Sequence, residues 1–254
     1  MLQFFKRIRK ELVSKNKVRK YFFYAIGEII LVVIGILIAL AINNSNEQRK
    51  LDDSEQKYLI ALQEEFNANL EEIERVMALS DSTYLACKRI INKKHENGRE
   101  LTDFELQKAL MNSFRFPPKF NQSPGILNEL ISSGNLSKLK NEELRSRIQN
   151  WLVTIEEVRD EEEEFWMHRE KAIDFMQKQF SFRKYMIDID EQFIGEILSQ
   201  GSSDINPELY YNDEMDNYIL FYTIVLRSLQ VGFYPTLQAD IEAILAEIDN
   251  SIDK

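Results

Sequence analysis

An uninterrupted apolar run near the N-terminus dominates the hydrophobic pattern of the chain. Residues 22–42 read FFYAIGEIILVVIGILIALAI, with Glu28 as the one charged residue. A helix of this length rises about 31 Å, close to the thickness of the hydrocarbon core of a bilayer. The eleven Ile, Leu and Val residues from Ile29 to Ile42 favour insertion by about 4 kcal/mol, which outweighs the roughly 3 kcal/mol cost of one carboxylate. The run therefore predicts a transmembrane helix over residues 21–43.

After this run, apolar residues recur every three or four positions, which is typical of amphipathic helices. The first amphipathic stretch can continue directly from the membrane helix, because neither Gly nor Pro lies between Ile42 and Leu79. Thr102 and Glu105 have the spacing of a capping box, which marks a helix start. The pattern predicts helices at 47–79, 81–94, 102–113, 125–133, 141–180, 190–200, 207–231 and 235–252. No stretch alternates as a strand does, so the predicted fold class is all-α, a single N-terminal transmembrane helix followed by an exported helical bundle.

The charges that flank the run orient the predicted span. Residues 1–20 carry eight basic residues and one acidic residue, Glu11. Basic flanks stay in the cytoplasm, so we expect the N-terminus there. Residues 44–254 are then an all-α domain outside the cytoplasm, held by a single pass through the membrane.

The basic arm over residues 1–20 has a helical pattern of its own. Leu2, Phe5, Ile8 and Leu12 recur at helical spacing, with the basic residues on other faces. This pattern favours an amphipathic helix lying on the membrane lipid of the cytoplasmic leaflet. The alternative is a charge cluster that sets the topology and forms no stable helix.

The end of the apolar run also resembles a cleavage site. Ala39-Leu40-Ala41 has the small-x-small form that signal peptidase recognises, and removal of the run is therefore an alternative to anchoring. The run exceeds the usual apolar core of a signal peptide, which has about 7–15 residues, and this excess favours an anchor that stays attached.

Composition narrows the classes of function. Hydrophobic residues make up 44% of the chain, enough for a core, and a net charge of −10 argues against nucleic acid as a partner. Eight Gly and five Pro are few for an all-β protein. One Cys and two His offer no disulfide framework, no Cys-based zinc site and no His-rich catalytic centre. Nucleotide-binding and hydrolase fingerprints are missing. We therefore expect no cofactor, no metal and no enzymatic activity.

Two segments of the chain carry a family resemblance. The first combines AIGEIILVVIGILIALAINN (25–44) with KYLIALQEEF (57–66), and the second is ILNELISSGNLSKLKNEELRSRIQNW (126–151). Their order and spacing resemble an uncharacterised family of single-pass membrane proteins from Bacteroidota-type bacteria, and they cover about a fifth of the chain. Such proteins often continue INNWNE, whereas this chain has Ser45 in place of the interfacial Trp. The resemblance implies that the span crosses a bacterial inner membrane and that residues 44–254 form a periplasmic all-α domain, and it implies no assigned activity.

One narrow face of the predicted span combines a polar group with small residues. The offsets between its members return to one side of a helix, and the members are Glu28, Val32, Gly35 and Ala39. Gly35 and Ala39 have the small-xxx-small spacing that permits close approach of a second helix. An intramembrane carboxylate is costly and marks a candidate site. We expect Glu28 to support a homo-oligomer or to dock on a polytopic partner, with proton transfer or a passive side chain as alternatives.

A second candidate is the loop FRFPPKFNQSPG over residues 114–125. Its three Pro residues exclude a regular helix. Phe114, Arg115, Phe116 and Phe120 make it a candidate docking loop, because aromatic and Arg side chains anchor interfaces. In the alternative interpretation, the Phe side chains pin the loop onto the bundle.

Two further features are interpreted as structural. Cys87 lies in LACKRII on a predicted helix, where burial as a small apolar residue is favoured over a disulfide between protomers or lipid attachment. Glu161–Glu164 precede His168, but the paired Glu-x-x-His motifs of di-iron bundles are missing. This charge run is interpreted as a solvated helix face.

These features favour a non-catalytic scaffold, accessory or sensor-like subunit of an envelope complex. Such a protein would assemble through its transmembrane helix and its helical periplasmic domain. The alternative is an ion-coupled, stator-like subunit that transduces force and uses Glu28 to carry protons.

Overall fold

The structure, a computed structural model, describes residues 18–94, 98–179 and 212–252. Helices account for most of these residues, and no β-strand forms among them; Lys94 and Glu100 make an isolated bridge. The predicted all-α fold class is thereby confirmed.

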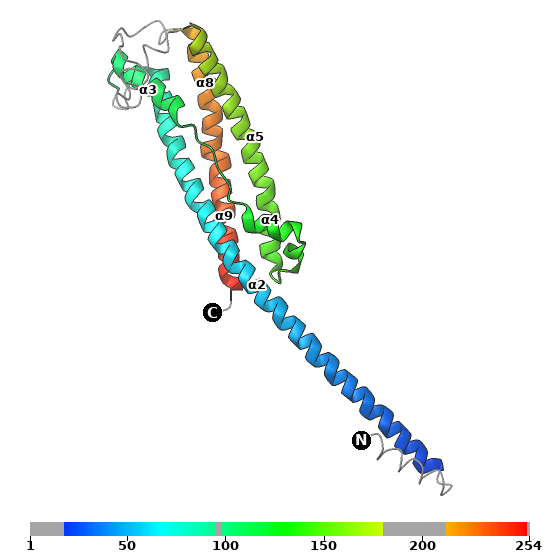
Figure 1. The fold of residues 1–254 in the computed structure, drawn as a ribbon. Helices are drawn as coiled ribbons and strands as arrows, with labels where there is room; N and C mark the ends of the chain where they lie inside the picture. The colour runs from blue at the N-terminus through cyan, green and yellow to red at the C-terminus, as the bar shows by residue number, and fades with distance from the viewer. Residues whose placement is uncertain (1–17, 95–97, 180–211, 253–254) are drawn as a thin grey trace, which may run out of the picture. The chain divides into compact units, whose positions relative to one another are not determined.

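The chain divides into two compact units, Met1–Lys57 and Tyr58–Lys254. The first unit consists, in its described part, of the beginning of α2 (Val18–Asn92) (Figure 1). This helix contains a stretch that is long and apolar enough to cross a membrane, by length and composition. The N-terminal arm up to residue 17 lies outside the described residues.

α2 is longer than the sequence pattern predicts. Separate helices at 47–79 and 81–94 were predicted, and this division is wrong because α2 continues without a break to Asn92. The hydroxyls of Ser80 and Thr83 donate to carbonyl oxygens of the preceding turn, at 2.8 and 3.0 Å. These hydrogen bonds satisfy the two hydroxyls within the helix, so the helix continues past them. The predicted continuity between the apolar run and the first amphipathic stretch is confirmed.

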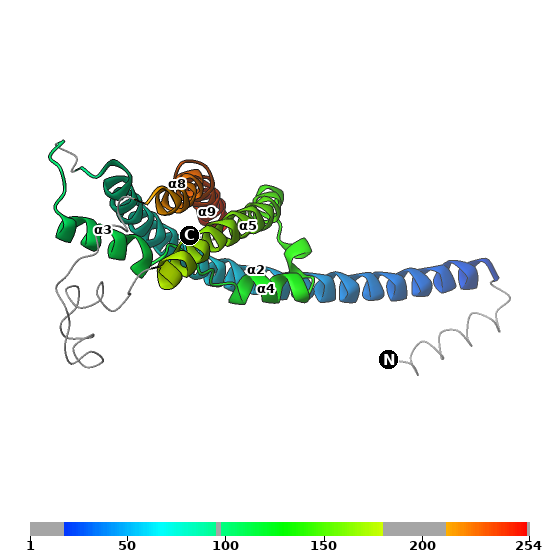
Figure 2. The ribbon, with the colours of Figure 1, turned by 90° about the horizontal axis from the view of Figure 1, so that it is seen from above.

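The described part of the second unit is an antiparallel bundle with four members (Figures 1 and 2). In chain order they are α2; α3 (Asp103–Arg115) with α4 (Gly125–Ser132) and the short helix η1 (Asn135–Lys138); α5 (Glu142–Gln179); and α8 (Asp213–Ser228) with η3 (Leu229–Phe233) and α9 (Tyr234–Ser251). Gln63 of α2 donates to Asp249 near the end of α9. Lys93, just after α2, pairs at 3.3 Å with Asp216 at the start of α8. The first and fourth members therefore run in opposite directions.

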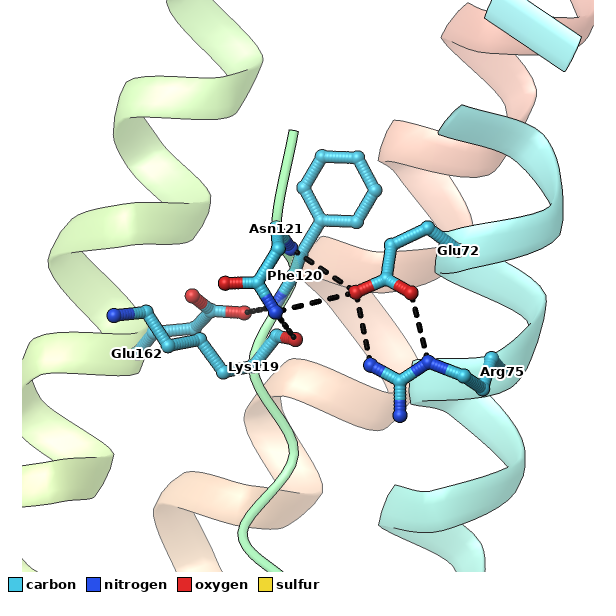
Figure 3. A network of polar contacts seen from close by, with 6 residues as sticks. All are labelled: Glu72, Arg75, Lys119, Phe120, Asn121 and Glu162. Carbon is cyan, nitrogen blue, oxygen red and sulfur yellow. Dashed lines mark hydrogen bonds and ion pairs between the residues drawn. The ribbon is translucent and has the colours of Figure 1, made fainter. Parts of the chain in front are cut away.

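The second member is not a continuous helix. Residues 117–124, here called the strap, join α3 to α4 as a non-helical stretch that passes between α2 and α5 (Figures 1 and 3). Pro117, Pro118 and Pro124 exclude a helix in the strap. An extended residue advances about 3.3 Å and a helical one about 1.5 Å. The strap therefore joins α3 to α4 with fewer residues than a helical connection of the same length would need.

The predicted helix ends agree with the structure where a local signal is strong. Thr102 and Glu105 form the predicted capping box, and α3 extends to Arg115, slightly beyond its predicted end at 113. Gly134 follows α4 with a φ of +72°, the left-handed conformation that favours glycine. The side chain of Asn141 accepts the Leu144 N–H at 2.9 Å and caps α5.

The last member differs from its prediction. A helix end near Val231 and a new start at Pro235 were predicted, but α8, η3 and α9 follow one another without a gap, and η3 is a π-helical turn. Pro lacks an N–H group, and its ring clashes with the carbonyl four residues earlier, so the wider π turn accommodates it. The Thr236 hydroxyl donates to the Gly232 carbonyl at 2.7 Å. The predicted start at Pro207 lies outside the described residues, but the prediction of a helix through residue 212 is wrong, because Asn212 is an extended N-cap and α8 begins at Asp213.

Large aromatic side chains fill the core between the members. Phe66 of α2 meets Trp151 of α5 edge to face, with ring centroids 5.1 Å apart. Tyr222 of α8 is stacked between Phe114 of α3 at 5.2 Å and Phe165 of α5 at 4.7 Å. All five side chains are buried, so aromatic contacts tie the four members together.

Candidate functional site

The predicted face of the span is exposed on α2. All four of its residues are exposed within the first unit, namely Glu28, Val32, Gly35 and Ala39. A Cβ atom added at Gly35 would meet no atom within 4 Å. Among the described residues, no other segment packs on this face. It is open to lipid or to a second helix.

The four residues of the predicted docking loop are split between core and surface. Phe114 and Phe120 are buried, which agrees with the interpretation that Phe side chains pin the loop onto the bundle. Phe116 is 58% exposed, and the Arg115 guanidinium lies 4.9 Å from the centre of its ring. The structure therefore leaves one exposed aromatic–cation pair, Arg115 with Phe116, next to the strap.

Side chains of α2 form hydrogen bonds with the backbone of the strap. A non-helical segment cannot satisfy its own N–H groups, so these groups need outside partners. Asn69, which is buried, accepts the Ser123 N–H at 2.8 Å and donates to the Ser123 carbonyl at 3.2 Å. Glu72 accepts both the N–H and the side-chain amide of Asn121 at 3.3 Å (Figure 3). These contacts hold one edge of the strap against α2.

Glu65 extends this row to the start of α4. Its carboxylate accepts the Ile126 N–H at 2.5 Å and the Leu127 N–H at 3.1 Å. Pro124 precedes α4 and offers no side-chain cap of its own. Glu65 therefore acts as the N-cap of a helix about sixty residues later in the chain, and its negative charge faces the positive end of that helix.

Glu162 of α5 holds the other edge of the strap. Its Oε1 accepts the Phe120 N–H at 2.7 Å (Figure 3) and the Tyr234 hydroxyl at 3.0 Å. Burial disfavours the ionised form and raises the pKa of Glu162, against the opposing effects of both hydrogen bonds and of the positive charges of Lys119 and Arg159. Glu65, Asn69, Glu72 and Glu162 together are called the clamp below.

The two carboxylates that flank the strap in Figure 3 have opposite environments. Glu72 is paired with Arg75 at 2.7 Å, and this hydrogen bond holds its pKa below the usual range despite some burial. Glu162 is 3% exposed, and the pKa of its carboxyl group is raised. A rise in proton concentration therefore neutralises Glu162 before Glu72.

Sequence reasoning missed the clamp. Glu162 was included in a charge run interpreted as a solvated face, and this interpretation is wrong for Glu162, which is buried. Its spacing from Val158 and Phe165, four and three residues, places it on the apolar side of the helix and was the available signal. Asn69 lies three residues after Phe66, which likewise places it on the apolar side of its helix. A polar residue at an apolar position calls for a buried hydrogen-bond partner.

Cys87 is buried, as predicted. Burial raises the pKa of its thiol to about 12, so the thiol is poorly suited to nucleophilic chemistry at neutral pH.

No group of three or more His, Cys, Asp and Glu side chains suited to a metal ion occurs among the described residues. Glu164 and His168 approach each other at 3.8 Å as a pair without a third member. His95 lies outside the described residues.

Over residues 18–94, 98–179 and 212–252 the fold defines a class: an all-α protein with one helix long and apolar enough to cross a membrane and a bundle whose second member is broken by a strap. The model of the Family of unknown function (DUF6090) matches residues 28–158, just over half of the chain, and the chain belongs to this family. The expectation of an uncharacterised family is thereby confirmed. The matched region begins at Glu28, contains the strap and ends within α5. No curated protein and no solved structure matches the chain.

Proposed function

We propose that this protein is a membrane-anchored, non-catalytic scaffold, accessory or sensor-like subunit of a bacterial envelope complex. Its N-terminus lies in the cytoplasm, residues 21–43 cross the inner membrane once, and the helical bundle lies on the periplasmic side. The excess of basic residues before the span supports this orientation. The proposal gives the chain no catalytic step.

One observation carries the proposal, the exposure of the apolar run. From Phe22 to Ile42 the large apolar side chains are between 37% and 67% exposed, and none is buried by the described chain. Water does not tolerate an apolar surface of this extent on a folded protein. Lipid, another helix or both must cover it.

The face with Glu28, Gly35 and Ala39 supplies the assembly contact. Gly35 has open space where a side chain would be, so the backbone of a partner helix can approach closely. Glu28 contributes a hydrogen bond between helices in a medium that offers no water. The partner is a second copy of the chain or a polytopic membrane protein.

The test is purification of the tagged full-length protein in mild detergent, with partners and stoichiometry determined by mass spectrometry. We expect a defined homo-oligomer or a complex with a polytopic protein, and Gly35→Leu should disrupt it. Gly27→Leu is the matched control, because Gly27 also has open space around it but lies about 80° around the helix. A monomer without partners, or equal effects of both substitutions, would overturn the proposal.

The intramembrane carboxylate favours a second candidate, an ion-coupled, stator-like subunit. In that function Glu28 carries protons, so Glu28→Gln abolishes activity although it preserves volume and most hydrogen bonding. In a scaffold the same substitution has a mild effect. Recovery of the chain as a homo-oligomer without a polytopic partner would exclude the stator-like function.

A further inference from the structure

Side chains from two helices attach residues 117–124 to the bundle, and among these attachments only Glu162 is both buried and ionisable, since Glu65 contacts the start of α4 instead. We propose that the strap is a proton-responsive clasp, in which protonation of Glu162 strengthens the closure of residues 117–124 over α2 and α5. This inference goes beyond the scaffold function and does not depend on it, because all its residues lie in the second unit.

The geometry makes the two edges of the strap unequal. On the α2 edge, Asn69 is uncharged. The Glu72 carboxylate is paired with the Arg75 guanidinium, and the Arg75 side chain is half exposed. Because the pKa of Glu72 is held below its usual range, mild acidification leaves these contacts in place. On the α5 edge, the buried Glu162 carboxylate accepts the Phe120 N–H at 2.7 Å. The α5 edge is therefore the one that responds to protons.

The charged and titratable groups that act on Glu162 come from the strap, α5 and α9. Lys119 on the strap and Arg159 on α5 both favour the ionised form through their positive charges. Tyr234 of α9 donates its hydroxyl to Glu162; burial and this carboxylate raise the pKa of Tyr234, so it remains a donor. From α8, Tyr222 donates to the Ser113 carbonyl at 2.7 Å instead.

The direction of the effect follows from proton linkage. Opening the strap hydrates Glu162 and returns its pKa to the ordinary range of a glutamate, whereas the closed form has a raised pKa. Between these two pKa values, the closed form binds more protons than the open form. Closure is therefore strongest below the ordinary pKa and weakens as pH rises through the raised pKa. Acidification tightens the strap.

A tightened strap also fixes the residues that lead into it. Arg115 and Phe116 form the exposed cation–aromatic pair immediately before residues 117–124. Closure restricts this pair to one position, and opening releases it. The clasp thus links proton concentration to the presentation of a surface suited to protein contacts.

The test is hydrogen–deuterium exchange, read by mass spectrometry, on full-length protein in detergent between about pH 5 and about pH 8. Exchange of strap peptides is corrected for the intrinsic pH dependence of exchange by reference to the denatured chain. Inside the window between the two pKa values, the opening constant of the strap should rise by up to about tenfold per pH unit. Above the window it should reach a plateau.

Three variants test whether Glu162 is the group that makes strap opening depend on pH. Glu162→Gln keeps an oxygen that accepts the Phe120 N–H but cannot titrate, so its opening constant should be independent of pH. Glu163→Gln removes the same charge from an exposed neighbouring position and should retain the pH dependence. Lys119→Gln, on an exposed side chain, should shift the midpoint to higher pH, because a charge that favours ionised Glu162 is lost.

An opening constant of the parent that does not change with pH would overturn the proposal. Equal pH dependence in the parent and in Glu162→Gln would overturn it as well, as would loss of the dependence in Glu163→Gln. If Glu162→Gln fails to fold, Lys119→Gln still tests the proposal. An unshifted midpoint in Lys119→Gln excludes Glu162 as the titrating group.

Discussion

Removal of the Glu65 carboxylate should destabilise the bundle through a helix that lies elsewhere in the sequence. Glu65 is 8% exposed and accepts the N–H groups of Ile126 and Leu127 at 2.5 and 3.1 Å. Pro124 provides no side-chain cap. In Glu65→Ala both N–H groups lose their acceptor, and the first turn of α4 loses the negative charge at its positive end.

The magnitude follows from the burial of the site. Loss of an ordinary N-cap costs about 0.5–2 kcal/mol. A hydrogen bond to a charged group contributes about 1.5–3 kcal/mol, and Glu65 makes two of them. Water can reach part of the vacated site, so we expect a loss of about 2–4 kcal/mol. For a domain of this size, that loss lowers Tm by roughly 5–15 °C.

The assay is thermal unfolding of the full-length protein in detergent, followed by the helical circular dichroism signal. Glu64→Ala is the matched control, because Glu64 is the exposed neighbour of Glu65 on the same helix. Glu65→Gln, which retains one acceptor oxygen, should fall between the two. If Glu65→Ala and Glu64→Ala differ by less than about 0.5 kcal/mol, the reasoning about a cap supplied from α2 is refuted.

Two further predictions concern local features of the bundle. Because burial raises the pKa of Cys87 to about 12, maleimide should label the native chain only at the rate of unfolding; labelling as fast as a free thiol would contradict this. Gly134→Ala should cost about 1–2 kcal/mol, because Gly134 has a φ of +72°. Gly232→Ala, in a helical position with open space, should instead be neutral or stabilising. Equal melting temperatures for these two Ala variants would contradict the assigned conformation.

Several features could be predicted because their signals are local. The length and apolarity of residues 22–42 predicted a helix able to cross a membrane. The capping box at Thr102, the glycine at Gly134 and the cap at Asn141 each follow from the geometry of one turn. Three Pro residues predicted an irregular segment after α3, and the strap confirms it.

Other features were missed because they depend on distant segments. The predicted docking loop treated Phe114, Phe116 and Phe120 alike, yet two of them are buried and Phe116 is exposed. Phe114 lies in the last turn of α3, four residues after the buried Leu110, whereas spacing cannot separate Phe116 from Phe120 because the segment after α3 has no regular period. The π turn at Pro235 also escaped prediction, because packing of α8 and α9 against α5 keeps the helix continuous through the Pro.

The sequence by itself determined the all-α class, the candidate span and most helix ends, because hydrophobic periodicity and capping act within one or two turns of backbone. Only the tertiary structure decided which polar side chains hold the strap. The strap cannot satisfy its N–H groups internally, so the partners are whichever side chains packing brings within about 3 Å. Here they are Asn69 and Glu72 from α2 and Glu162 from α5. Glu162, which the sequence places in a charged run, is a buried hydrogen-bond acceptor because the Pro-rich strap passes between α2 and α5 beside it.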